Sequence, residues 1–196
     1  EALARAAARA EASYRALAGD LSKKRRFAAN ELTHRVTAAM QELAMAGGRF
    51  EIGLVPVKEP ASYGLEQVEF RVASHPGQPL GPLARVASGG ELSRIALAIQ
   101  VVTSEVGHVP TLVVDEVDAG IGGAVAVTVG RLLQALGTRR QVLCVTHLPQ
   151  VATCADAHYR VSKDGDGARA TSIVAELDRA GRQEEIARML GGAEVT

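Results

Sequence analysis

The amino-acid sequence predicts an α/β fold, in which a parallel sheet with crossover helices follows a long helical segment. Three observations support this fold. Residues 1–46 combine strong helix formers with apolar residues three and four positions apart. Two short apolar runs, at residues 111–114 and 141–145, are typical of strands in a parallel sheet. Segments with helical periodicity lie before, between and after these runs, as crossover connections require.

Residues 1–46 are predicted to form two consecutive helices. Gly19 is expected to interrupt the first helix, and Asp20 to cap the second, which ends at Gly47 and Gly48. The first helix has the spacing of a coiled-coil seam, and the second carries one apolar stripe. The seam consists of Leu3, Ala7, Ala10, Tyr14, Leu17 and Leu21, and the stripe of Leu32, Val36, Met40 and Leu43.

We interpret residues 1–20 as the root of an antiparallel coiled-coil arm, and the second helix as a packing helix. The alternative is that both helices only cover a globular core. Our interpretation divides the chain into a stub at residues 1–46 and a lobe at residues 47–196.

The lobe is predicted to begin with two half-buried strands, at residues 49–57 and 66–73, because apolar and polar residues alternate there. A loop at residues 75–82 follows. The remaining elements are helices at 92–106, 122–136 and 183–190, buried strands at 111–114 and 141–145, and weaker strands at 159–163 and 169–176 around a turn at 165–167.

Composition sets bounds on function. The chain has 196 residues, 47% of them hydrophobic, so it can bury a sizeable core. Lys and Arg balance Asp and Glu at 22 each, so the net charge argues neither for nor against nucleic acid. Two cysteines make no disulfide framework, and no long apolar stretch or signal peptide is present, so we expect a cytoplasmic protein. The start at Glu1, without Met and within a helical pattern, suggests a fragment of a longer protein.

Ser88, Gly89 and Gly90 form the first candidate site, at the start of a predicted helix. The glycines allow close approach of the backbone, and the N–H groups of a first helical turn favour an anion. A phosphate-binding turn is the functional interpretation. A plain helix cap is the alternative, and it would be favoured if the turn stood alone.

Asp115 and Glu116 form the second candidate site, at the end of the apolar run 111–114. Ligands of α/β sheets bind beyond the carboxyl ends of the strands. Two acids there suit the binding of Mg²⁺ and the orientation of an attacking water. The alternative is an ordinary acidic strand end on the surface.

His147 ends the next apolar run in the same way, so its imidazole could donate a hydrogen bond to a phosphate oxygen. A structural histidine is the alternative. Metal binding by His147 with Cys144 or Cys154 is possible, but the spacing fits no zinc pattern, and Cys144 is expected to pack within its strand.

The densest basic cluster is Lys23, Lys24, Arg25 and Arg26, on the predicted second helix. Contact with DNA phosphates and a solvated helix face are equally good interpretations of it. No G-x-x-x-x-G-K-[ST] loop occurs in the chain. A phosphate-cradling loop would therefore have to come from elsewhere.

Taken together, these motifs resemble the second half of an ABC-type ATPase. Residues 87–91 resemble the signature motif, residues 111–116 the Walker B strand with its glutamate, residues 117–120 the D-loop, and His147 the switch histidine. Longer strings are similar to the SMC-like members of this family that act in bacterial DNA repair. They are VASGGELSR at 86–94, DEVDAGI at 115–121, CVTHLPQVA at 144–152 and MLGG at 189–192.

The resemblance covers about residues 45–196, and for residues 1–44 it is positional, since a coiled coil returns into this lobe in SMC-like proteins. The signature departs from its commonest form at Ala87 and Glu91, which stand for Leu and Gln. Neither change touches the serine and glycines expected to meet phosphate. The turn at 117–120 also differs from the transporter pattern.

The resemblance implies the C-terminal lobe of an ATPase head that acts in DNA double-strand break repair and recombination. An N-terminal lobe would supply the Walker A loop, and ATP with Mg²⁺ would lie between two heads, with DNA as a further partner. The implied roles are catalysis by Glu116 and His147, metal binding by Asp115, and nucleotide binding by Ser88, Gly89, Gly90, Glu91 and Asp118.

The signature helix is expected to start well away from the Asp115 strand end, so that it can serve the nucleotide of a second head. Two other classes stay open. One is the nucleotide-binding subunit of a membrane transporter, against which the N-terminal helices argue. The other is an interaction lobe without catalysis.

Overall fold

A computed structural model of the chain describes residues 1–85, 88–104, 109–164 and 171–191. The chain divides into two compact units, Glu1–Ala87 and Ser88–Thr196, which we call unit 1 and unit 2. The predicted division into a stub that ends at residue 46 and a lobe that begins at residue 47 stays a prediction. In the structure, the long helix and the hairpin that follows it belong to the same unit.

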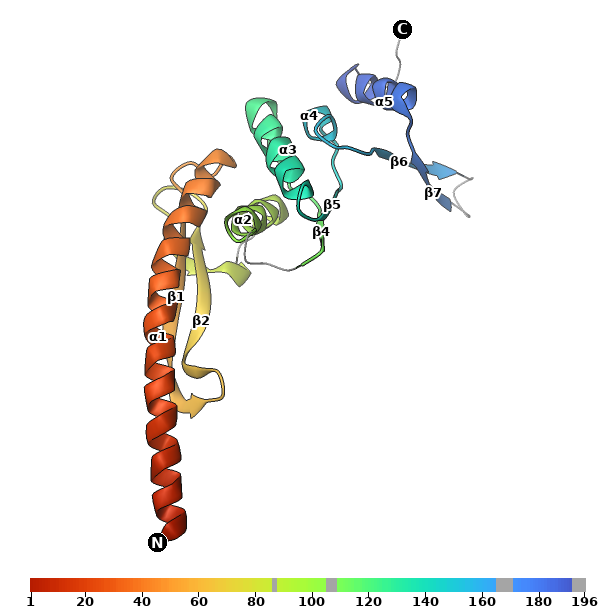
Figure 1. Cartoon of the computed structure of the whole chain (residues 1–196). Coiled ribbons are helices and arrows are strands. Elements are labelled where there is room, and N and C mark those ends of the chain that lie inside the picture. Colours follow the sequence, from red (N-terminus) through yellow and green to blue (C-terminus); the bar gives the residue numbers. More distant parts are fainter. Residues whose placement is uncertain (86–87, 105–108, 165–170, 192–196) are drawn as a thin grey trace. The chain divides into compact units, whose positions relative to one another are not determined.

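Unit 1 is one long helix packed along an antiparallel hairpin (Figure 1). The helix α1 spans Ala2–Glu42, and the hairpin consists of β1, Arg49–Ala61, and β2, Gly64–Ala73. A two-residue strand β3, Gly81–Pro82, pairs with β2, and the 3₁₀ turn η1 spans Leu83–Arg85. The hairpin is longer than predicted, because β1 continues past Pro56 through an irregularity in its pairing with β2.

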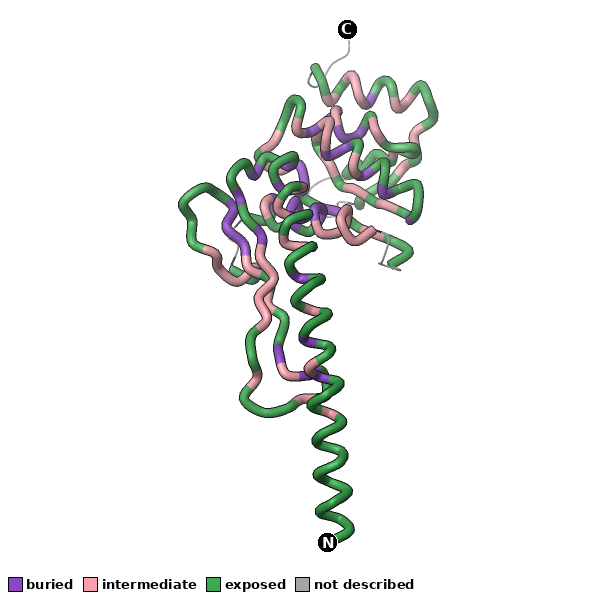
Figure 2. Tube along the Cα trace, turned by 60° about the vertical axis from the view of Figure 1, so that its left-hand side comes forward, coloured by how far each residue is buried: buried purple, intermediate pink, exposed green. Residues whose placement is uncertain are grey.

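The core of unit 1 lies between α1 and the hairpin. The buried residues of α1 fall on one helical stripe, which begins at Ala18 and continues through Ser22, Ala29, Val36 and Met40. Figure 2 shows the first turns of α1 exposed throughout. Phe50, Val72 and Ala73 are the buried apolar residues of the hairpin.

Two threonines of α1 satisfy backbone groups of β1. Thr37 Oγ1 accepts a hydrogen bond from Phe50 N at 3.0 Å, and Thr33 Oγ1 accepts one from Ile52 N at 3.2 Å. β1 pairs with β2 on one side only, so these hydroxyls bond N–H groups that the sheet does not use. The helix thus covers the open edge of the sheet.

The predicted break at Gly19 is wrong, because α1 runs through it without interruption. A glycine costs a helix only about 1 kcal/mol relative to alanine. Contacts on both sides offset this cost: Tyr14 Oη donates to the Ala61 carbonyl at 2.9 Å, and Ala18 and Ser22 are buried.

The predicted seam is displaced by one residue where the hairpin lies. The structure buries Ala18 and Ser22, whereas Leu17 is 71% exposed and Leu21 is exposed as well. Small residues let the hairpin approach α1 closely, and the larger leucines remain on a neighbouring face. Leu3, Ala7 and Ala10 are exposed too, so the seam is uncovered in this chain.

Unit 2 begins with a helix, which is followed by a β-α-β arrangement. Helix α2, Gly89–Val102, precedes strand β4, Thr111–Val114, and helix α3, Gly123–Gly137, connects β4 to strand β5, Gln141–Cys144. β4 and β5 pair in parallel, in the register Thr111↔Gln141 to Val114↔Cys144. The predicted parallel strands and crossover helix are therefore confirmed. The predicted continuation of α2 is wrong at residues 103 and 104, because the helix ends at Val102 and these two residues form a turn. Residues 105 and 106 of the predicted helix and part of the connection to β4 lie outside the described residues.

The predicted burial of these two strands is wrong on one face. Val113 of β4 is 66% exposed, and Leu143 of β5 and the following Val145 are exposed as well. Val114, on the opposite side of β4, is buried, as are Val129 and Leu133 of α3. Among the described residues, helices thus cover one face of the strand pair and leave the other uncovered.

The rest of unit 2 is a short helix, a hairpin and a last helix. The helix α4, Pro149–Ala152, was not predicted. Strands β6, Tyr159–Asp164, and β7, Thr171–Glu176, pair antiparallel, and α5 spans Arg179–Gly191, four residues earlier than expected. The predicted turn at 165–167 lies outside the described residues. Within the described part of the chain, no helix is both long and apolar enough to cross a membrane.

Candidate functional site

The two acids that follow β4 are exposed at the end of the strand. Asp115 Oδ1 accepts a hydrogen bond from the Glu116 N–H at 2.9 Å. Glu116 has φ 56°, in the left-handed region that side chains rarely adopt. A backbone in that conformation is typical of functional sites, where the surrounding structure holds it. The turn that follows is closed by a hydrogen bond from Ala119 N to the Glu116 carbonyl at 3.1 Å.

Ser88 caps helix α2, as the interpretation of this turn as a plain helix cap requires. Its hydroxyl oxygen accepts a hydrogen bond from Glu91 N at 3.4 Å, and Gly89 is the first helical residue. The hydroxyl proton can still be donated, because this bond uses only the oxygen. The described geometry is therefore compatible with both a cap and an anion site. Ala87, the signature position that departs from leucine, lies outside the described residues.

The expectation that α2 starts well away from the Asp115 strand end is wrong. Gly89 lies against the Glu116 carboxylate, and a Cβ at Gly90 would come within 2.8 Å of the Ala119 Cβ. Arg94, one turn further along α2, is buried and donates from Nη1 to the Ala119 carbonyl at 2.7 Å. Burial lowers the pKa of this guanidinium, but a nearby Glu91 opposes that effect.

The N-terminus of α2 lies near the end of β4 because of the direction in which α2 packs. Arg140, just before β5, reaches the other end of α2, where it donates to Gln100 Oε1 at 3.2 Å and to the Ser104 carbonyl at 3.0 Å. Helix α2 therefore runs antiparallel to the strand pair. Its N-terminus and the carboxyl ends of β4 and β5 lie at the same edge of unit 2, which we call the site edge.

His147 reaches the site edge from the end of β5 and is 70% exposed. Its Nδ1 lies 3.2 Å from Asp118 Oδ2, and its backbone N–H donates to the same oxygen at 3.0 Å. Thr146 Oγ1 donates to that oxygen as well. Asp118 is only 2% exposed, so the two hydrogen bonds, from the His147 N–H and the Thr146 hydroxyl, hold a buried carboxylate that also faces the His147 ring.

The role of Thr146 was missed by sequence reasoning. The signal that could have found it is a hydroxyl next to a histidine at a strand end, opposite an acid on the neighbouring turn. Direct nucleotide contact by Asp118 stays a prediction.

Burial raises the pKa of the Cys144 thiol to about 11, and the nearby Asp118 and Asp115 carboxylates act in the same direction. This thiol is protonated at neutral pH, which disfavours it as a metal ligand or nucleophile. Among the described residues, no group of three His, Cys, Asp or Glu could hold a metal ion. The donor set at the site edge fits a magnesium nucleotide better, since two exposed carboxylates and a helix N-terminus leave other ligands to phosphate and water.

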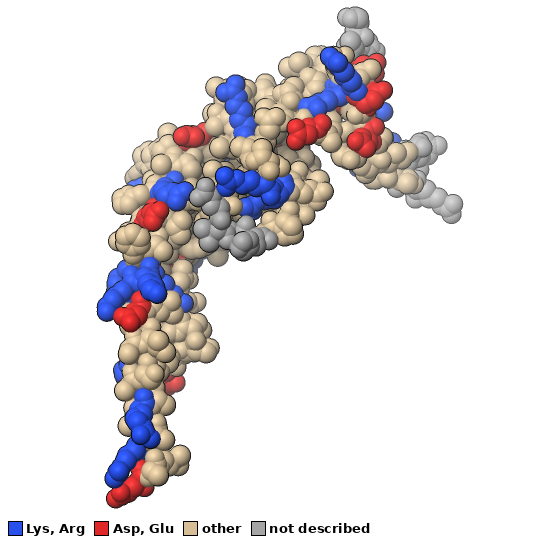
Figure 3. All heavy atoms as spheres, in the orientation of Figure 1, with Lys and Arg blue, Asp and Glu red and all other residues tan. Residues whose placement is uncertain are grey.

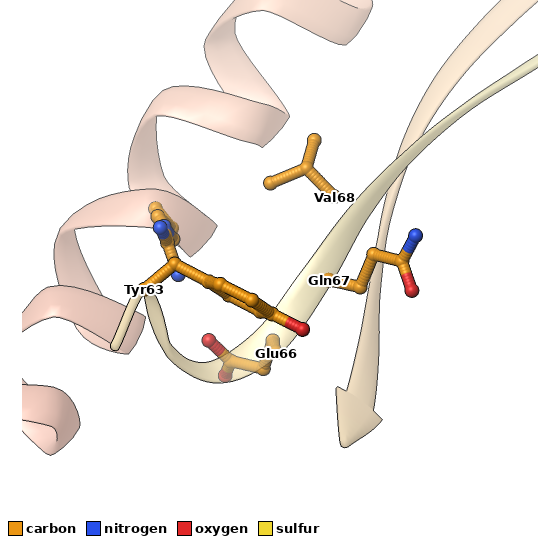
Figure 4. Close-up of a pocket in the computed structure, with 5 residues that line it drawn as sticks. Tyr63, Glu66, Gln67 and Val68 are labelled. Atoms are coloured by element: carbon orange, nitrogen blue, oxygen red, sulfur yellow. The ribbon is translucent and has the colours of Figure 1, made fainter. Parts of the chain in front are cut away.

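The basic cluster belongs to unit 1, where α1 carries basic and acidic side chains close together (Figure 3). Lys23 contacts Asp20 at 3.1 Å, and Arg26 lies 3.5 Å from Glu66. Arg25 is half-buried and lines a pocket of about 340 Å³ between α1 and the tip of the hairpin. The other residues that line it are Tyr63, Glu66, Gln67 and Val68 (Figure 4).

The hairpin therefore engages Arg25 and Arg26, and Lys24 is exposed. This arrangement favours a structural interpretation for two of the four cations. DNA contact by the cluster stays a prediction.

Comparison with known proteins connects these observations. The chain is 50% identical over 185 residues to the DNA repair protein RecN of Xylella fastidiosa (strain Temecula1), which covers 93% of this chain and 33% of that protein. It is 45% identical over 182 residues to RecN of Vibrio cholerae, which covers 92% of this chain and 33% of that protein. The chain thus spans about one third of the length of the curated relatives it matches. No protein-family model matches the chain.

Solved structures agree on the fold. An Smc head domain with a coiled coil from Pyrococcus yayanosii matches with a TM-score of 0.60 at 21% identity, over 84% of this chain and 30% of that one. A chain from a study of ATP-driven dimerization and DNA stimulated activation of SMC ATPases matches with a TM-score of 0.51 at 21% identity, over 87% of this chain and 96% of that one. The chain therefore has the fold of part of an SMC head, as the sequence predicted.

Proposed function

We propose that this chain, which is similar to one third of RecN and has the fold of an SMC head, is the C-terminal half of an ATPase head that acts in DNA double-strand break repair and recombination. The observation that carries the proposal is the site edge. A helix N-terminus with its serine, an acidic strand end and an exposed histidine converge there from three separate segments. The identity of the relatives favours this function over a transporter subunit.

The residues of the site edge divide the chemistry among them. Glu116 orients or deprotonates the attacking water, and His147 donates a hydrogen bond to a phosphate oxygen. Asp115 holds Mg²⁺, directly or through water. When bound, Mg²⁺ neutralises the charge that develops on the phosphates.

An N-terminal lobe with a phosphate-cradling loop completes the site. The sequence lacks such a loop, and the exposed face of β4 and β5, with Val113 and Leu143, is apolar. A parallel pair of strands is normally covered on both faces and extended by further strands. The missing lobe supplies both, and this chain alone hydrolyses ATP negligibly.

The signature loop serves the nucleotide of a second head. Support comes from the related SMC ATPases that undergo ATP-driven dimerization. Ser88, Gly89, Gly90 and Glu91 form the N-terminus of α2, of which Ser88 and Gly89 are exposed. The N–H groups and dipole of a helix N-terminus favour a phosphate. DNA is the further partner, which implies that the protein works at the bacterial nucleoid in the cytoplasm.

The experiment mixes two inactive versions of the full-length protein. One carries Ser88→Arg, and the other has an intact signature but a disabled phosphate-cradling loop. One composite site then pairs an intact loop with an intact signature. We expect each version alone to be inactive and the mixture to recover part of the ATPase activity.

The control for folding is ATP binding, which Ser88→Arg should leave intact, because Ser88 serves the partner's nucleotide. No recovery from two folded, associating proteins would overturn action across heads. Ser88 would then serve only its own nucleotide or its own helix. Full activity of Ser88→Arg alone would remove the signature from the mechanism altogether.

A further inference from the structure

Asp118 occupies an unusual position for a residue expected to touch a ligand. It is buried, it lies on the turn that carries Glu116, and a single oxygen of its carboxylate accepts hydrogen bonds from Thr146 Oγ1 and from the His147 backbone N–H, the latter at 3.0 Å. The ring Nδ1 of His147 lies 3.2 Å from the same oxygen. The main contact of Asp118 is therefore the histidine.

The position of Nδ1 beside Asp118 favours one of the two ring tautomers. A carboxylate only accepts hydrogen bonds, so an Asp118 oxygen 3.2 Å from Nδ1 favours the proton on that nitrogen. The other nitrogen, Nε2, is then the one that an exposed imidazole turns toward a ligand. Without such a partner, a neutral imidazole in water favours the opposite tautomer, with its proton on Nε2.

The backbone beside the ring is fixed as well. Thr146 Oγ1 donates to Asp118 and accepts a hydrogen bond from Leu148 N at 3.0 Å. Val117, which precedes Asp118, is fully buried and anchors the turn. These hydrogen bonds join the segment after β5 to the turn after β4. The backbone that carries the imidazole is therefore held in place.

We propose that Asp118 is a positioning residue that keeps the Nδ1 proton on His147 and directs Nε2 toward the nucleotide, in place of contacting the nucleotide itself. The part of this inference that concerns the nucleotide rests on the proposed function. The part that concerns the Nδ1 proton does not, because it describes the protein without ATP. Buried carboxylates that orient a histidine are a general device for fixing its tautomer.

The first experiment reads the tautomer directly. The full-length protein is prepared without nucleotide and with ¹⁵N-labelled histidine, and the ring nitrogens of His147 are assigned by comparison with His147→Gln. We expect the neutral ring to carry its proton on Nδ1 in the wild type. Asp118→Ala should move it to Nε2, whereas Thr146→Val, the matched control that removes only a different donor, should leave it on Nδ1.

The wild-type spectrum alone can overturn the proposal, whatever the variants do. A proton on Nε2 in the wild type would show that Asp118 does not hold the ring. Should Asp118→Ala fail to fold, Asp118→Asn retains an acceptor oxygen and should keep the proton on Nδ1. A proton on Nε2 in a folded Asp118→Asn protein would overturn the role of this acceptor oxygen.

The second experiment separates positioning from nucleotide contact by a double-mutant cycle in ATPase assays. Asp118→Ala should lower kcat about 10- to 100-fold, as loss of a partner that orients a functional histidine commonly does. In the His147→Gln background the same change should have almost no further effect, because both residues act through one ring. An equal further loss in that background would mean that Asp118 touches the nucleotide independently, which overturns the proposal. If the wild type has no ATPase activity, the proposed function fails. The tautomer experiment then still decides whether Asp118 positions His147.

Discussion

Unit 1 buries one stripe of its long helix against its own hairpin, whereas unit 2 leaves one face of its parallel strands bare. In unit 1 the stripe of α1 meets the hairpin, and Val36 and Met40 are fully buried. In unit 2, Val113 and Leu143 face outward, and the candidate catalytic residues Glu116 and His147 are exposed beside them. The contrast indicates that the packing of α1 on the hairpin serves stability, whereas the bare strand face of unit 2 is available for contact with another part of the protein. Substitutions in the two units should therefore affect different properties.

The largest effect is expected for Glu116→Gln in the full-length protein. Removal of a general base typically lowers kcat by about 10²- to 10⁴-fold. ATP affinity and the free energy of unfolding should change little, because Glu116 is exposed and the substitution is nearly isosteric. The measurements are ATPase rates, nucleotide titration and denaturant unfolding. A loss of ATP affinity as large as the loss of rate would make Glu116 a structural residue or a metal ligand.

Met40→Ala should show the opposite behaviour. Truncating a fully buried methionine costs about 2–5 kcal/mol of folding free energy, since it leaves a cavity between α1 and the hairpin. Leu17→Ala is the matched control, because Leu17 is exposed on the same helix and should change stability by less than about 0.5 kcal/mol. Chemical denaturation measures both. Equal effects of the two substitutions would contradict the packing described for unit 1.

Gly89→Ala tests the close approach within unit 2. A methyl group at this position collides with the Glu116 carboxylate, which is the flexible end of a side chain and can move away. Little stability should therefore be lost, but displacing the carboxylate should lower kcat about tenfold, because misplaced catalytic groups lose rate steeply. Gly19→Ala is the control, since nothing lies near its Cβ, and it should stabilise the helix by up to about 1 kcal/mol. An unchanged rate for Gly89→Ala would show that Glu116 does not act from this position.

The smallest effect is expected for the basic cluster. If Lys24 contacts duplex DNA, Lys24→Ala in the full-length protein should reduce the slope of log affinity against log salt by about 0.9. Arg26→Ala is the matched comparison. It should alter the slope less, because Arg26 lies against Glu66. Equal slopes for wild type and Lys24→Ala would leave Lys24 on a solvated helix face.

Elements set by local sequence were predictable. The bounds of β4 match the apolar run at residues 111–114, and α3 matches its periodicity to within a residue. The uninterrupted helix at Gly19 was not predictable, because contacts with Ala61 and the hairpin, distant in sequence, outweigh the glycine. The same contacts displaced the buried stripe from Leu17 to Ala18.

At the candidate site, the residues were predictable and their contacts were not. Short motifs pointed to Ser88, Glu116 and His147. The approach of Gly89 to Glu116 depends on α2 running antiparallel to β4, which no local pattern encodes. The bond between Asp118 and His147 joins residues 29 positions apart, on turns that only the sheet brings together.

The two threonines that bond the edge of β1 also fix how α1 is seated. Thr33 and Thr37 are four residues apart on the helix, a rise of about 6 Å. Their partners Ile52 and Phe50 are two residues apart on the strand, a rise of about 6.6 Å. The two spacings match, so a slide of one residue or a turn about the helix axis breaks both bonds together. Force or torque applied to the exposed end of α1 must therefore break both hydrogen bonds before the helix can slide or turn against the hairpin.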